Sequence, residues 1–436
     1  MRKKFKDIYI LGIGGSGMSS IAKYLAQSGH KVKGYDQRKS FITNQLEQDG
    51  ISIDFDKEKL TYSTDIHYIY SSAMNMDDEY LVKYKNKENV VSRPDWLSAV
   101  SHSNRVIGIT GTHGKTSTTA LLAHIFHYNN SDVSYIFGGS TAFSGIGGHK
   151  GDWNQPLVLE TDEAFNTFKN FKIQDLLVTN IDEDHLDYFK SFNNLKDAFK
   201  NVIEKVENNL VLNYDDEYLK TIQVNTNCLT YSSKEDTDFK IEFPNKFTFD
   251  NTDYEINTNL IGSHFISNIV GGVCLAYLNG ISVDDSLEAI ESFPGVKRRI
   301  EYLGSVLGVK VYDDYGHHPT EIDATITALK ESTRGNLFVI FQPHRYSRTK
   351  NNFQNFKDVL KKADLSIVLD IYPAGETIIP GVSSKNFEFE NIKYLKSMRM
   401  VPSFLSNRIN QNDTILTIGA GDITLLGPEI IKYFDE

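Results

Sequence analysis

The stretch GITGTHGKTSTTA, residues 108–120, carries residue types that suit binding of a nucleotide phosphate. A strand that ends in a glycine-rich turn and opens a helix aims several backbone N–H groups and the positive end of the helix dipole at one point. Lys115 can reach the β- and γ-phosphates, and the Thr116 hydroxyl can hold Mg²⁺. A glycine turn beside a surface lysine is the alternative. The agreement of strand, turn, Gly-Lys-Thr and helix favours a phosphate loop, shortened because Ile109 stands where the common pattern has its first glycine.

A second glycine-rich turn, LGIGGSGMSS at residues 11–20, spaces Gly12, Gly14 and Gly17 as GxGxxG between an expected strand and an expected helix. Asp36 ends the next expected strand. This arrangement lets a pyrophosphate approach the helix N-terminus closely and is typical of dinucleotide binding. The ligand can be NAD or another diphosphate such as a UDP-sugar. A tight strand–helix turn without any ligand is the alternative.

Two further strand ends carry residues that can bind a metal ion, in the stretches LETDE (159–163) and TNIDEDHLDYF (179–189). Ligands of parallel sheets bind beyond the carboxyl ends of the strands. We therefore expect Glu160 and His185 at the same sheet edge as the phosphate loop, where they can complete the coordination of a metal that bridges the phosphates. A solvated acidic loop is the alternative for DEDHLD, and its position directly after a strand favours the metal site.

A third group of polar side chains follows two expected strands nearer the C-terminus, in the stretches DDYGHHPTE and FQPHRYSRT. These strand ends are expected to bring together His317, His318, His344, Arg345 and Arg348. Two forked guanidinium groups near each other suit a carboxylate or phosphate. Exposed arginines beside a helix-capping turn are the alternative.

The composition excludes some classes of partner. The 436 residues carry a formal net charge of −11, which disfavours a nucleic acid or an anionic membrane bound through bulk charge. No run approaches the ~18 apolar residues that a membrane span needs. The two cysteines, Cys228 and Cys274, have no metal-binding or CxxC spacing. We expect a soluble cytoplasmic protein without a nucleic-acid or membrane partner, either a monomer or a homodimer.

The order of strands and helices predicts the elements that must position these residues. Strands are expected at residues 8–14, 31–36, 66–73, 105–110, 156–160, 176–180, 309–314, 336–343, 365–370 and 415–421. Helices are expected at 18–28, 115–128, 193–206, 262–278 and 320–332, with a small antiparallel excursion within 213–260. Strands that alternate with helices indicate largely parallel sheets. The alternation restarts twice, which predicts three α/β domains at 1–103, 104–297 and 298–436.

Together, these motifs resemble those of the Mur ligase family. The resemblance rests on GTHGKTS, TNIDEDHLD, GVKRR, DDYGHHPTE, FQPHRYSRT, YPAGE and IGAGDI, and it extends from about residue 7 to the C-terminus. It implies a Rossmann-like N-terminal domain that binds a UDP-sugar, a central P-loop ATPase domain and a Rossmann-like C-terminal domain that binds an amino acid. It further implies ATP-dependent ligation of L-alanine to UDP-N-acetylmuramate through an acyl phosphate, with Mg²⁺ or Mn²⁺, in peptidoglycan precursor synthesis.

The resemblance also implies roles for individual residues. The ATP contacts are Gly111, Thr112, His113, Gly114, Lys115, Thr116, Ser117 and Asn268. The UDP-sugar contacts are Gly12, Gly14, Gly15, Ser16, Gly17, Asp36, Ser71 and Ser72. The alanine contacts are His317, His344, Arg345 and Arg348. The metal ligands are Thr116, Glu160 and His185, and the catalytic residues are Lys115, Glu160 and His185.

Three positions bear on how far the family pattern carries over. His264-Phe265 replaces the usual His-Asn, and Pro94–Trp96 stands where residues resembling Ala-Glu-Met are common. Phe199 stands where some sister ligases carry a carbamylated lysine, so no such lysine is expected.

Four other functions remain open. A ligase that attaches a preformed tripeptide is the nearest alternative, although the paired arginines suit a small amino acid better. A folylpolyglutamate synthase would not need the first glycine motif. An oxidoreductase would leave GTHGKTS unused, and a non-catalytic nucleotide switch would leave Glu160 and His185 without a purpose.

Overall fold

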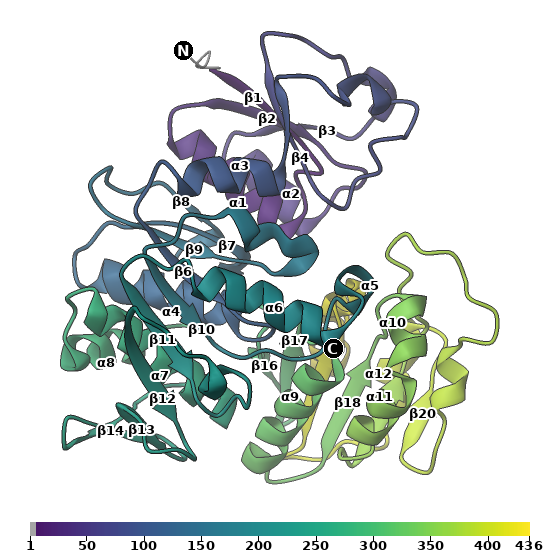
Figure 1. Cartoon of the computed structure of the whole chain (residues 1–436). Helices are drawn as coiled ribbons and strands as arrows, with labels where there is room; N and C mark the ends of the chain where they lie inside the picture. Colours follow the sequence, from purple (N-terminus) through teal and green to yellow (C-terminus); the bar gives the residue numbers. More distant parts are fainter. Residues whose placement is uncertain (1–5) are drawn as a thin grey trace. The chain divides into compact units, whose positions relative to one another are not determined.

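The computed structural model describes residues 6–436, apart from the side chain of Asp187, and contains sheets of five, ten and six strands. The chain forms two compact units (Figure 1). One unit runs to Thr258 and takes in Ile266–Val296, and it holds the first two sheets. The other comprises Asn259–Phe265 and Lys297–Glu436 and holds the third sheet.

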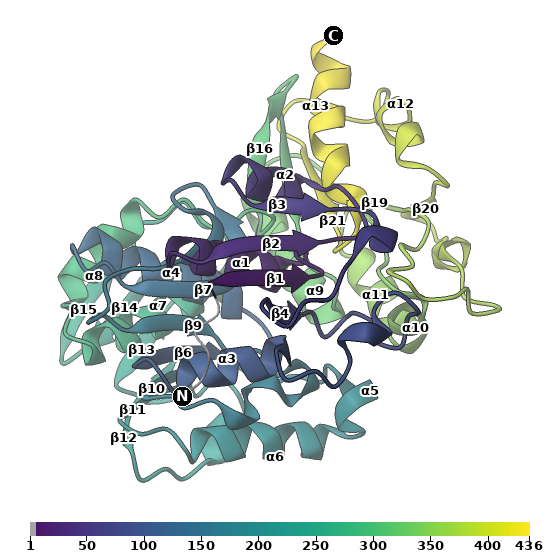
Figure 2. The same cartoon turned by 90° about the horizontal axis from the view of Figure 1, so that it is seen from above.

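The first sheet is fully parallel, and its strands β1 to β3 run side by side in Figure 2. In spatial order its strands are β3 (Ser52–Asp54), β2 (Lys31–Tyr35), β1 (Asp7–Leu11), β4 (His67–Tyr70) and β5 (Val90–Ser92). Its helices are α1 (Ser16–Gln27), α2 (Phe41–Gln48), η1 (Lys57–Lys59), η2 (Val82–Tyr84) and α3 (Arg93–Ser101). The strand order reverses at β1, so a ligand crevice is expected at the carboxyl ends of β1 and β4.

The central strands β1 and β4 of the first sheet are largely buried on both faces, whereas β2 and β3 alternate between buried and exposed residues. Ile8 and Ile10 pack with Met18 and Ile21 of α1 on one face. Leu11 belongs to a separate, tyrosine-rich cluster on the other. Helix α1 also packs against the second sheet, where the Ser20 hydroxyl donates to the Phe137 carbonyl at 2.6 Å.

The second sheet is mixed, with antiparallel pairing at both edges. In spatial order its strands are β15 (Thr252–Glu255), β14 (Lys246–Phe249), β13 (Phe239–Glu242), β12 (Asn227–Ser232), β11 (Asn209–Asn213), β10 (Asp175–Val178), β6 (Val106–Thr110), β9 (Leu157–Glu160), β7 (Ser134–Thr141) and β8 (Gly145–His149). All five residues of β6 are buried, as befits a central strand. Its neighbours β9 and β10 run parallel to it, so three loops leave from one sheet edge.

The helices of this part include α4, which begins directly after the phosphate loop and buries ten of its fourteen residues. The helices are α4 (Lys115–Tyr128), η3 (Ala164–Asn170), α5 (Leu186–Phe189), α6 (Phe192–Ile203), η4 (Leu219–Thr221), α7 (Ser263–Leu278) and α8 (Val283–Glu291). Helix α6 is amphipathic and begins where the Ser191 side chain accepts a hydrogen bond from the Asn194 N–H.

The third sheet has five parallel strands and one antiparallel edge strand, β16. In spatial order its strands are β16 (Glu301–Val306), β17 (Val309–Asp314), β21 (Thr414–Ile418), β18 (Leu337–Phe341), β19 (Leu365–Val368) and β20 (Ile392–Tyr394). Its helices are α9 (Pro319–Ser332), α10 (Tyr346–Asn351), α11 (Phe353–Leu360), η5 (Ser384–Phe387), η6 (Met398–Met400), α12 (Val401–Leu405), η7 (Asp422–Leu425) and α13 (Leu426–Asp435). Helices α9 and α11 cover one face, and α12 and α13 cover the other (Figure 2).

The predicted α/β class is confirmed, and each predicted strand and helix overlaps an observed one. The antiparallel excursion is narrower than predicted, because β12 and β13 pair in parallel and only β13, β14 and β15 alternate in direction. No helix between residues 6 and 436 is long and apolar enough to cross a membrane.

Candidate active site

The phosphate loop lies between β6 and α4 and is fixed by the residues that follow β10. The Thr179 hydroxyl donates to the His113 carbonyl at 2.6 Å, and the His113 N–H donates to Asn180 Oδ1 at 2.9 Å. Gly111 and Gly114 both have positive φ angles, of +134° and +83°. A Cβ at Gly111 would lie 2.1 Å from the Thr179 hydroxyl, so this close approach requires glycine.

Lys115 starts α4 and is held at the loop by several acceptors. Its Nζ donates to the carbonyls of Gly111 at 2.6 Å and Thr112 at 3.0 Å, and it lies 2.9 Å from Glu163 Oε2. Burial alone would lower the Lys115 pKa, but the surrounding carboxylates, chiefly Glu163 and then Asp162, outweigh it and raise the pKa. The ammonium group therefore stays charged at the point where a phosphate would bind.

Thr116 and Glu160 form a second pair at the same sheet edge, as the sequence predicts. The Thr116 hydroxyl donates to Glu160 Oε1 at 2.8 Å. The other carboxylate oxygen accepts the Gly138 N–H at 2.5 Å, which fixes the side chain. A hydroxyl beside a carboxylate is an oxygen donor set of the kind that Mg²⁺ takes.

His185 lies beside Asp184, whose Oδ2 is 3.8 Å from its Nε2, and beside two carboxylates that the sequence reasoning missed, Asp162 and Glu163. His185 Nε2 is 3.9 Å from Glu163 Oε1, and one ligand atom from each of His185, Asp162 and Glu163 lies within 4.8 Å of the others. Burial, together with the charge of Asp162, raises the Glu163 pKa against the opposing effect of Lys115. Burial also disfavours the charged form of Asp162, but Lys115 and Arg93 more than offset it and lower the Asp162 pKa. The stretch LETDE thus supplies three carboxylates to this edge, of which the sequence reasoning selected one.

Three other predicted ATP-site residues surround the loop. His113 Nε2 lies 2.9 Å from Asp182 Oδ2. Asn268, in α7, lies so close to Gly114 that a Cβ there would be 2.7 Å from Asn268 Oδ1. Ser117 is buried in the first turn of α4. The structure thus brings all of the predicted ATP-site residues together at one end of α4.

The first glycine motif lies at the switch point of the first sheet. The Gly12 N–H donates to the Tyr35 carbonyl at 2.8 Å, and a Cβ at Gly12 would lie 3.0 Å from the Ser71 Cβ. Asp36 Oδ2 accepts the Gly14 N–H at 2.8 Å, and Oδ1 accepts the Arg38 N–H at 3.3 Å. Asp36 therefore shapes the loop through the backbone, whereas the exposed Ser72 makes no such bond among those described.

Gly15 and Ser16 complete this loop at the start of α1. Gly15 is the N-cap residue, and the Ser16 carbonyl accepts hydrogen bonds from two hydroxyls of the next turn, at 2.9 Å and 3.0 Å. Gly17 packs against the guanidinium group of Arg93, to which a Cβ would come within 2.9 Å. The predicted UDP-sugar residues therefore gather around the loop after β1 and the end of β4.

The predicted amino-acid residues gather at the carboxyl ends of β17 and β18. The rings of His317 and His344 have centroids 6.2 Å apart, and Arg348 Nη1 lies 3.4 Å from His344 Nδ1. Burial lowers the His344 pKa to about 3, helped by the positive charges of His317, Arg348 and Arg345. The neutral ring accepts from Arg348 and stacks on Tyr372, with centroids 5.6 Å apart.

Arg345 occupies an unusual backbone conformation, with φ of +72°. Its N–H donates to the Tyr372 carbonyl at 2.8 Å, which anchors the turn before α10. Glu376 accepts from the Ser347 N–H at 3.0 Å and from the Ser347 hydroxyl at 2.5 Å. Strained backbone of this kind is retained where surrounding contacts hold it, often at functional sites.

The aromatic residues at the three positions that bear on the family pattern, Phe265, Trp96 and Phe199, are all buried. Phe265 is buried in the apolar core of the second unit. Burial lowers the pKa of the neighbouring His264 to about 4, with the Arg299 charge acting in the same direction. Pro94 lies in the first turn of α3, and Trp96 packs edge-on against Tyr24 with centroids 6.2 Å apart. Phe199 is buried edge-on against Phe168, with centroids 5.2 Å apart.

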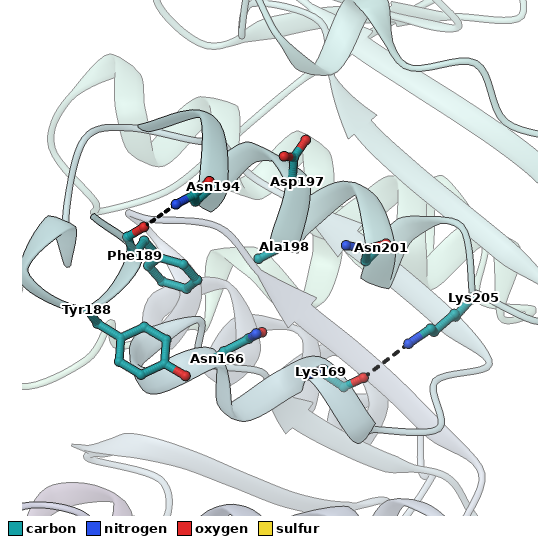
Figure 3. Close-up of a pocket in the computed structure, with 9 residues that line it drawn as sticks. All are labelled: Asn166, Lys169, Tyr188, Phe189, Asn194, Asp197, Ala198, Asn201 and Lys205. Carbon is teal, nitrogen blue, oxygen red and sulfur yellow. Dashed lines mark hydrogen bonds between the residues drawn. The ribbon is translucent and has the colours of Figure 1, made fainter. Parts of the chain in front are cut away.

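A cavity of about 530 Å³ opens beside the His185 loop, among η3, α5 and α6 (Figure 3). Its lining is mainly polar, and it comprises Asn166, Lys169, Tyr188, Phe189, Asn194, Asp197, Ala198, Asn201 and Lys205. The Asn194 side chain donates to the Phe189 carbonyl at 2.6 Å, which ties α6 to the end of α5. None of the predicted site residues lines this cavity.

Comparison with known proteins gives consistent matches along the chain. The Mur ligase family, catalytic domain, matches residues 7–105; the Mur ligase middle domain matches 109–276; and the Mur ligase, glutamate ligase domain, matches 298–421. A UDP-N-acetylmuramate–L-alanine ligase of Syntrophus aciditrophicus is 32% identical over 100% of this chain and 95% of its own length. One of Geotalea daltonii is 34% identical, with 100% of both chains covered.

The solved structures agree with these matches. The crystal structure of a UDP-N-acetylmuramate–alanine ligase from Thermotoga maritima superposes with a TM-score of 0.83 and 25% identity. The superposition covers 98% of this chain and 99% of that one.

Proposed function

We propose that this chain, which belongs to the Mur ligase family, ligates L-alanine to UDP-N-acetylmuramate at the expense of ATP, in peptidoglycan precursor synthesis. The observation that carries the proposal is the gathering of Lys115, the Thr116–Glu160 pair and the Glu163–His185 pair at one sheet edge. The full-length similarity to L-alanine ligases supports the choice of substrates. An amide bond between a carboxylate and an amine then forms because ATP improves the leaving group.

The reaction is proposed to pass through an acyl phosphate. An oxygen of the muramate lactyl carboxylate attacks the γ-phosphorus of ATP, and ADP leaves. The alanine amine then attacks the carbonyl carbon, phosphate leaves with the carboxylate oxygen, and the nitrogen loses a proton. Lys115, which stays charged, stabilises the negative charge on the phosphoryl group during transfer.

Mg²⁺ or Mn²⁺ is the proposed metal, because the residues present fit an oxygen-preferring divalent cation. Thr116 and Glu160 would hold it beside the phosphates, and His185 with Asp162 and Glu163 provides a second set of ligands nearby. When bound, the metal neutralises phosphate charge and orients the γ-phosphoryl group. Binding of the nucleotide would also offer Lys115 a phosphate in place of Glu163, which frees that carboxylate for the cation.

The remaining substrates are assigned to the other two strand-end clusters. The UDP-sugar pyrophosphate is proposed to bind at the N–H groups of the loop that contains Gly12 and Gly17, and Ser71 flanks this loop. Arg345 and Arg348 are proposed to grip the alanine carboxylate, so that its amine is positioned for attack. Asn268, beside Gly114, is the proposed adenine contact.

The proposal also covers the cellular compartment, the division into domains and the oligomeric state. We place the enzyme in the cytoplasm, since both cysteines are free thiols, which suits a reducing compartment. We retain the predicted division into domains at 1–103, 104–297 and 298–436. Both a monomer and a homodimer fit the proposal.

The test supplies the full-length protein with Mg²⁺, ATP and UDP-N-acetylmuramate, together with L-alanine, the tripeptide or neither. Phosphate release and product mass are measured. Release that depends on L-alanine, with a product heavier by one alanyl group, is expected. Release with the tripeptide alone would reassign the enzyme to tripeptide ligation, and no release from the folded protein would contradict the proposed activity.

A further inference from the structure

Two histidines and one aspartate converge at the far end of α4 from the phosphate loop. His127 lies in the last turn of α4, Asp132 in the loop that follows, and His149 at the end of β8. His149 Nε2 is 2.8 Å from Asp132 Oδ1, and His127 Nε2 is 3.8 Å from the same oxygen. We propose that these three side chains form a binding site for a divalent metal ion that prefers nitrogen and oxygen ligands, as Zn²⁺ does.

The ligand chemistry and spacing suit such an ion. Imidazole and carboxylate together favour Zn²⁺ and related metals over Mg²⁺, which prefers an all-oxygen shell. Tetrahedral Zn²⁺ with bonds of about 2.0–2.1 Å holds its N and O ligands about 3.3 Å apart. One ligand atom from each residue already lies within 4.8 Å of the others, so small side-chain movements would complete the site.

The surrounding residues hold the two imidazole rings in place. The Tyr135 ring stacks on His149, with centroids 5.2 Å apart, and meets His127 edge-on at 5.5 Å. The two histidine rings are themselves 5.1 Å apart, at an interplanar angle of 70°. Packing of this kind restricts the rotamers that metal binding would otherwise have to order.

The backbone holds the aspartate beside them. The Asp152 N–H donates to the Asp132 carbonyl at 2.9 Å. A Cβ at Gly151 would lie 2.1 Å from that carbonyl oxygen, so the two segments can approach only because Gly151 is glycine. The Asp132 side chain is 48% exposed, which leaves room for water as a fourth ligand.

Metal binding must compete with hydrogen bonds that the histidine rings make when no ion is bound. His127 Nε2 lies 3.0 Å from the Val133 carbonyl, and a carbonyl can only accept, so this nitrogen carries the proton when no ion is bound. His149 Nε2 carries its proton for the same reason, since it lies 2.8 Å from a carboxylate oxygen of Asp132. Coordination exchanges these two hydrogen bonds for metal–nitrogen bonds and moves each ring proton to Nδ1. The ion would link the end of α4 to β8 and stabilise this region, without contact to the ligase residues at the start of α4.

The test titrates the metal-free full-length protein with Zn²⁺, in excess Mg²⁺ that occupies the oxygen-rich site. Calorimetry gives the affinity, and the thermal midpoint gives the stabilisation. The variants are His149→Gln and Asp132→Asn, and the control is His102→Gln, which alters an exposed histidine of the same unit. His185 is unchanged in all of these proteins, so any difference between them reports the cluster.

We expect the wild type and the control to bind one Zn²⁺ ion per chain. In both cluster variants the Zn²⁺ affinity should fall by at least about 10- to 100-fold, or binding should be lost. Zn²⁺ should raise the thermal midpoint of the wild type and of the control only. Ligase activity with Mg²⁺ should be unchanged in all four proteins, which also shows that they fold. Equal Zn²⁺ affinity in the wild type and both variants would overturn the proposal, as would no binding by the wild type.

Discussion

Lys115 is charged and held among carboxylates before any nucleotide binds. Its side chain is 12% exposed and that of Glu163 is 1% exposed, so the pair is shielded from water and from salt. Its ammonium group already points at the loop carbonyls of Gly111 and Thr112. A phosphate that binds to Lys115 would replace Glu163, while the two backbone carbonyls keep the ammonium group in place for electrostatic catalysis.

Substitution of Lys115 should therefore slow phosphoryl transfer without affecting the UDP-sugar site that is proposed at the first sheet. We expect Lys115→Ala to lower the rate of phosphate release by about 10²- to 10³-fold. Binding of UDP-N-acetylmuramate, measured by calorimetry, should be unchanged. Lys172→Ala, at an exposed ion pair of the same unit, is the matched control. Normal ligation by Lys115→Ala would remove the phosphate-loop assignment.

Arg348 is proposed to bind L-alanine and not the nucleotide. Loss of its charged hydrogen bonds to a carboxylate should raise the KM for alanine by about 10- to 100-fold in Arg348→Ala, with the KM for ATP little changed. The exposed Arg399→Ala is the control, and steady-state kinetics provide the measurement. If the two KM values moved together, Arg348 would have a structural role.

The sequence alone does not predict which of several neighbouring carboxylates point toward the metal-binding edge. The strand end LETDE predicted a metal-binding edge, and Glu160 lies beside Thr116 as expected. Asp162 and Glu163 were not selected, because the chain leaves the strand after Glu160 and the period of two no longer says where each side chain points. Similarly, Asp36 was predicted as a ligand contact, and only the structure reveals that both of its oxygens accept backbone N–H groups.

At the scale of elements, the turn between β6 and α4 depends on glycine for two separate reasons. Gly114 and Gly280 have similar φ angles, of +83° and +89°, but only Gly114 has a neighbour within 4 Å of an added Cβ. Alanine at either position should cost roughly 1–2 kcal/mol of stability through the left-handed backbone. The comparison therefore separates backbone strain from crowding.

We expect Gly114→Ala to displace Asn268 and raise the KM for ATP, whereas Gly280→Ala should lower the thermal midpoint and leave that KM unchanged. Kinetics and thermal unfolding of the two variants provide the measurement. An unchanged KM for ATP in Gly114→Ala would mean that neither the turn nor Asn268 helps to bind the nucleotide.

The end of β17 carries a buried carboxyl group that should make stability depend on pH. Burial raises the Asp314 pKa to about 6, although Arg299 and the N–H groups of Gly316 and Ile300 oppose the shift. The folded state therefore binds the proton more tightly than the unfolded state, whose carboxyl titrates near pH 4. Stability from this group rises as pH falls from about 7 to about 4 and is lost as pH rises through 6.

This dependence can be isolated by substitution. The wild type should gain up to about 3 kcal/mol relative to Asp314→Asn over that window, because one pKa unit corresponds to about 1.4 kcal/mol. The difference in unfolding free energy between the two proteins, measured at pH 5 and at pH 8, checks it. A difference that does not change with pH would show that Asp314 is ionised throughout.

Apolar periodicity located the buried parallel strands and the long helices, because these follow the two regular periods. The hairpin of β7 and β8 was not predicted, since its sequences SYIFGGST and GIGGH are rich in glycine and lack alternation. The pairing of β12 with β13 was not predicted either, because parallel partners are set by the whole sheet and not by the local sequence.

At the scale of the whole molecule, each of the three sheets provides one set of polar residues at the carboxyl ends of its strands. Strand order explains this, because the loops after β1 and β4, after β6, β9 and β10, and after β17 and β18 each leave from a shared sheet edge. The sequence motifs could be placed in advance because all of them directly follow apolar runs. Three substrates and three strand-end sites agree with a single ligation reaction.

The most direct test of the acyl-phosphate account follows one oxygen atom. UDP-N-acetylmuramate labelled with ¹⁸O in its lactyl carboxylate is incubated with the enzyme, Mg²⁺, ATP and L-alanine, and the products are analysed by mass spectrometry. We expect an alanyl product together with inorganic phosphate that carries one ¹⁸O from the carboxylate. An alanyl product formed with unlabelled phosphate would contradict activation of the carboxylate by ATP.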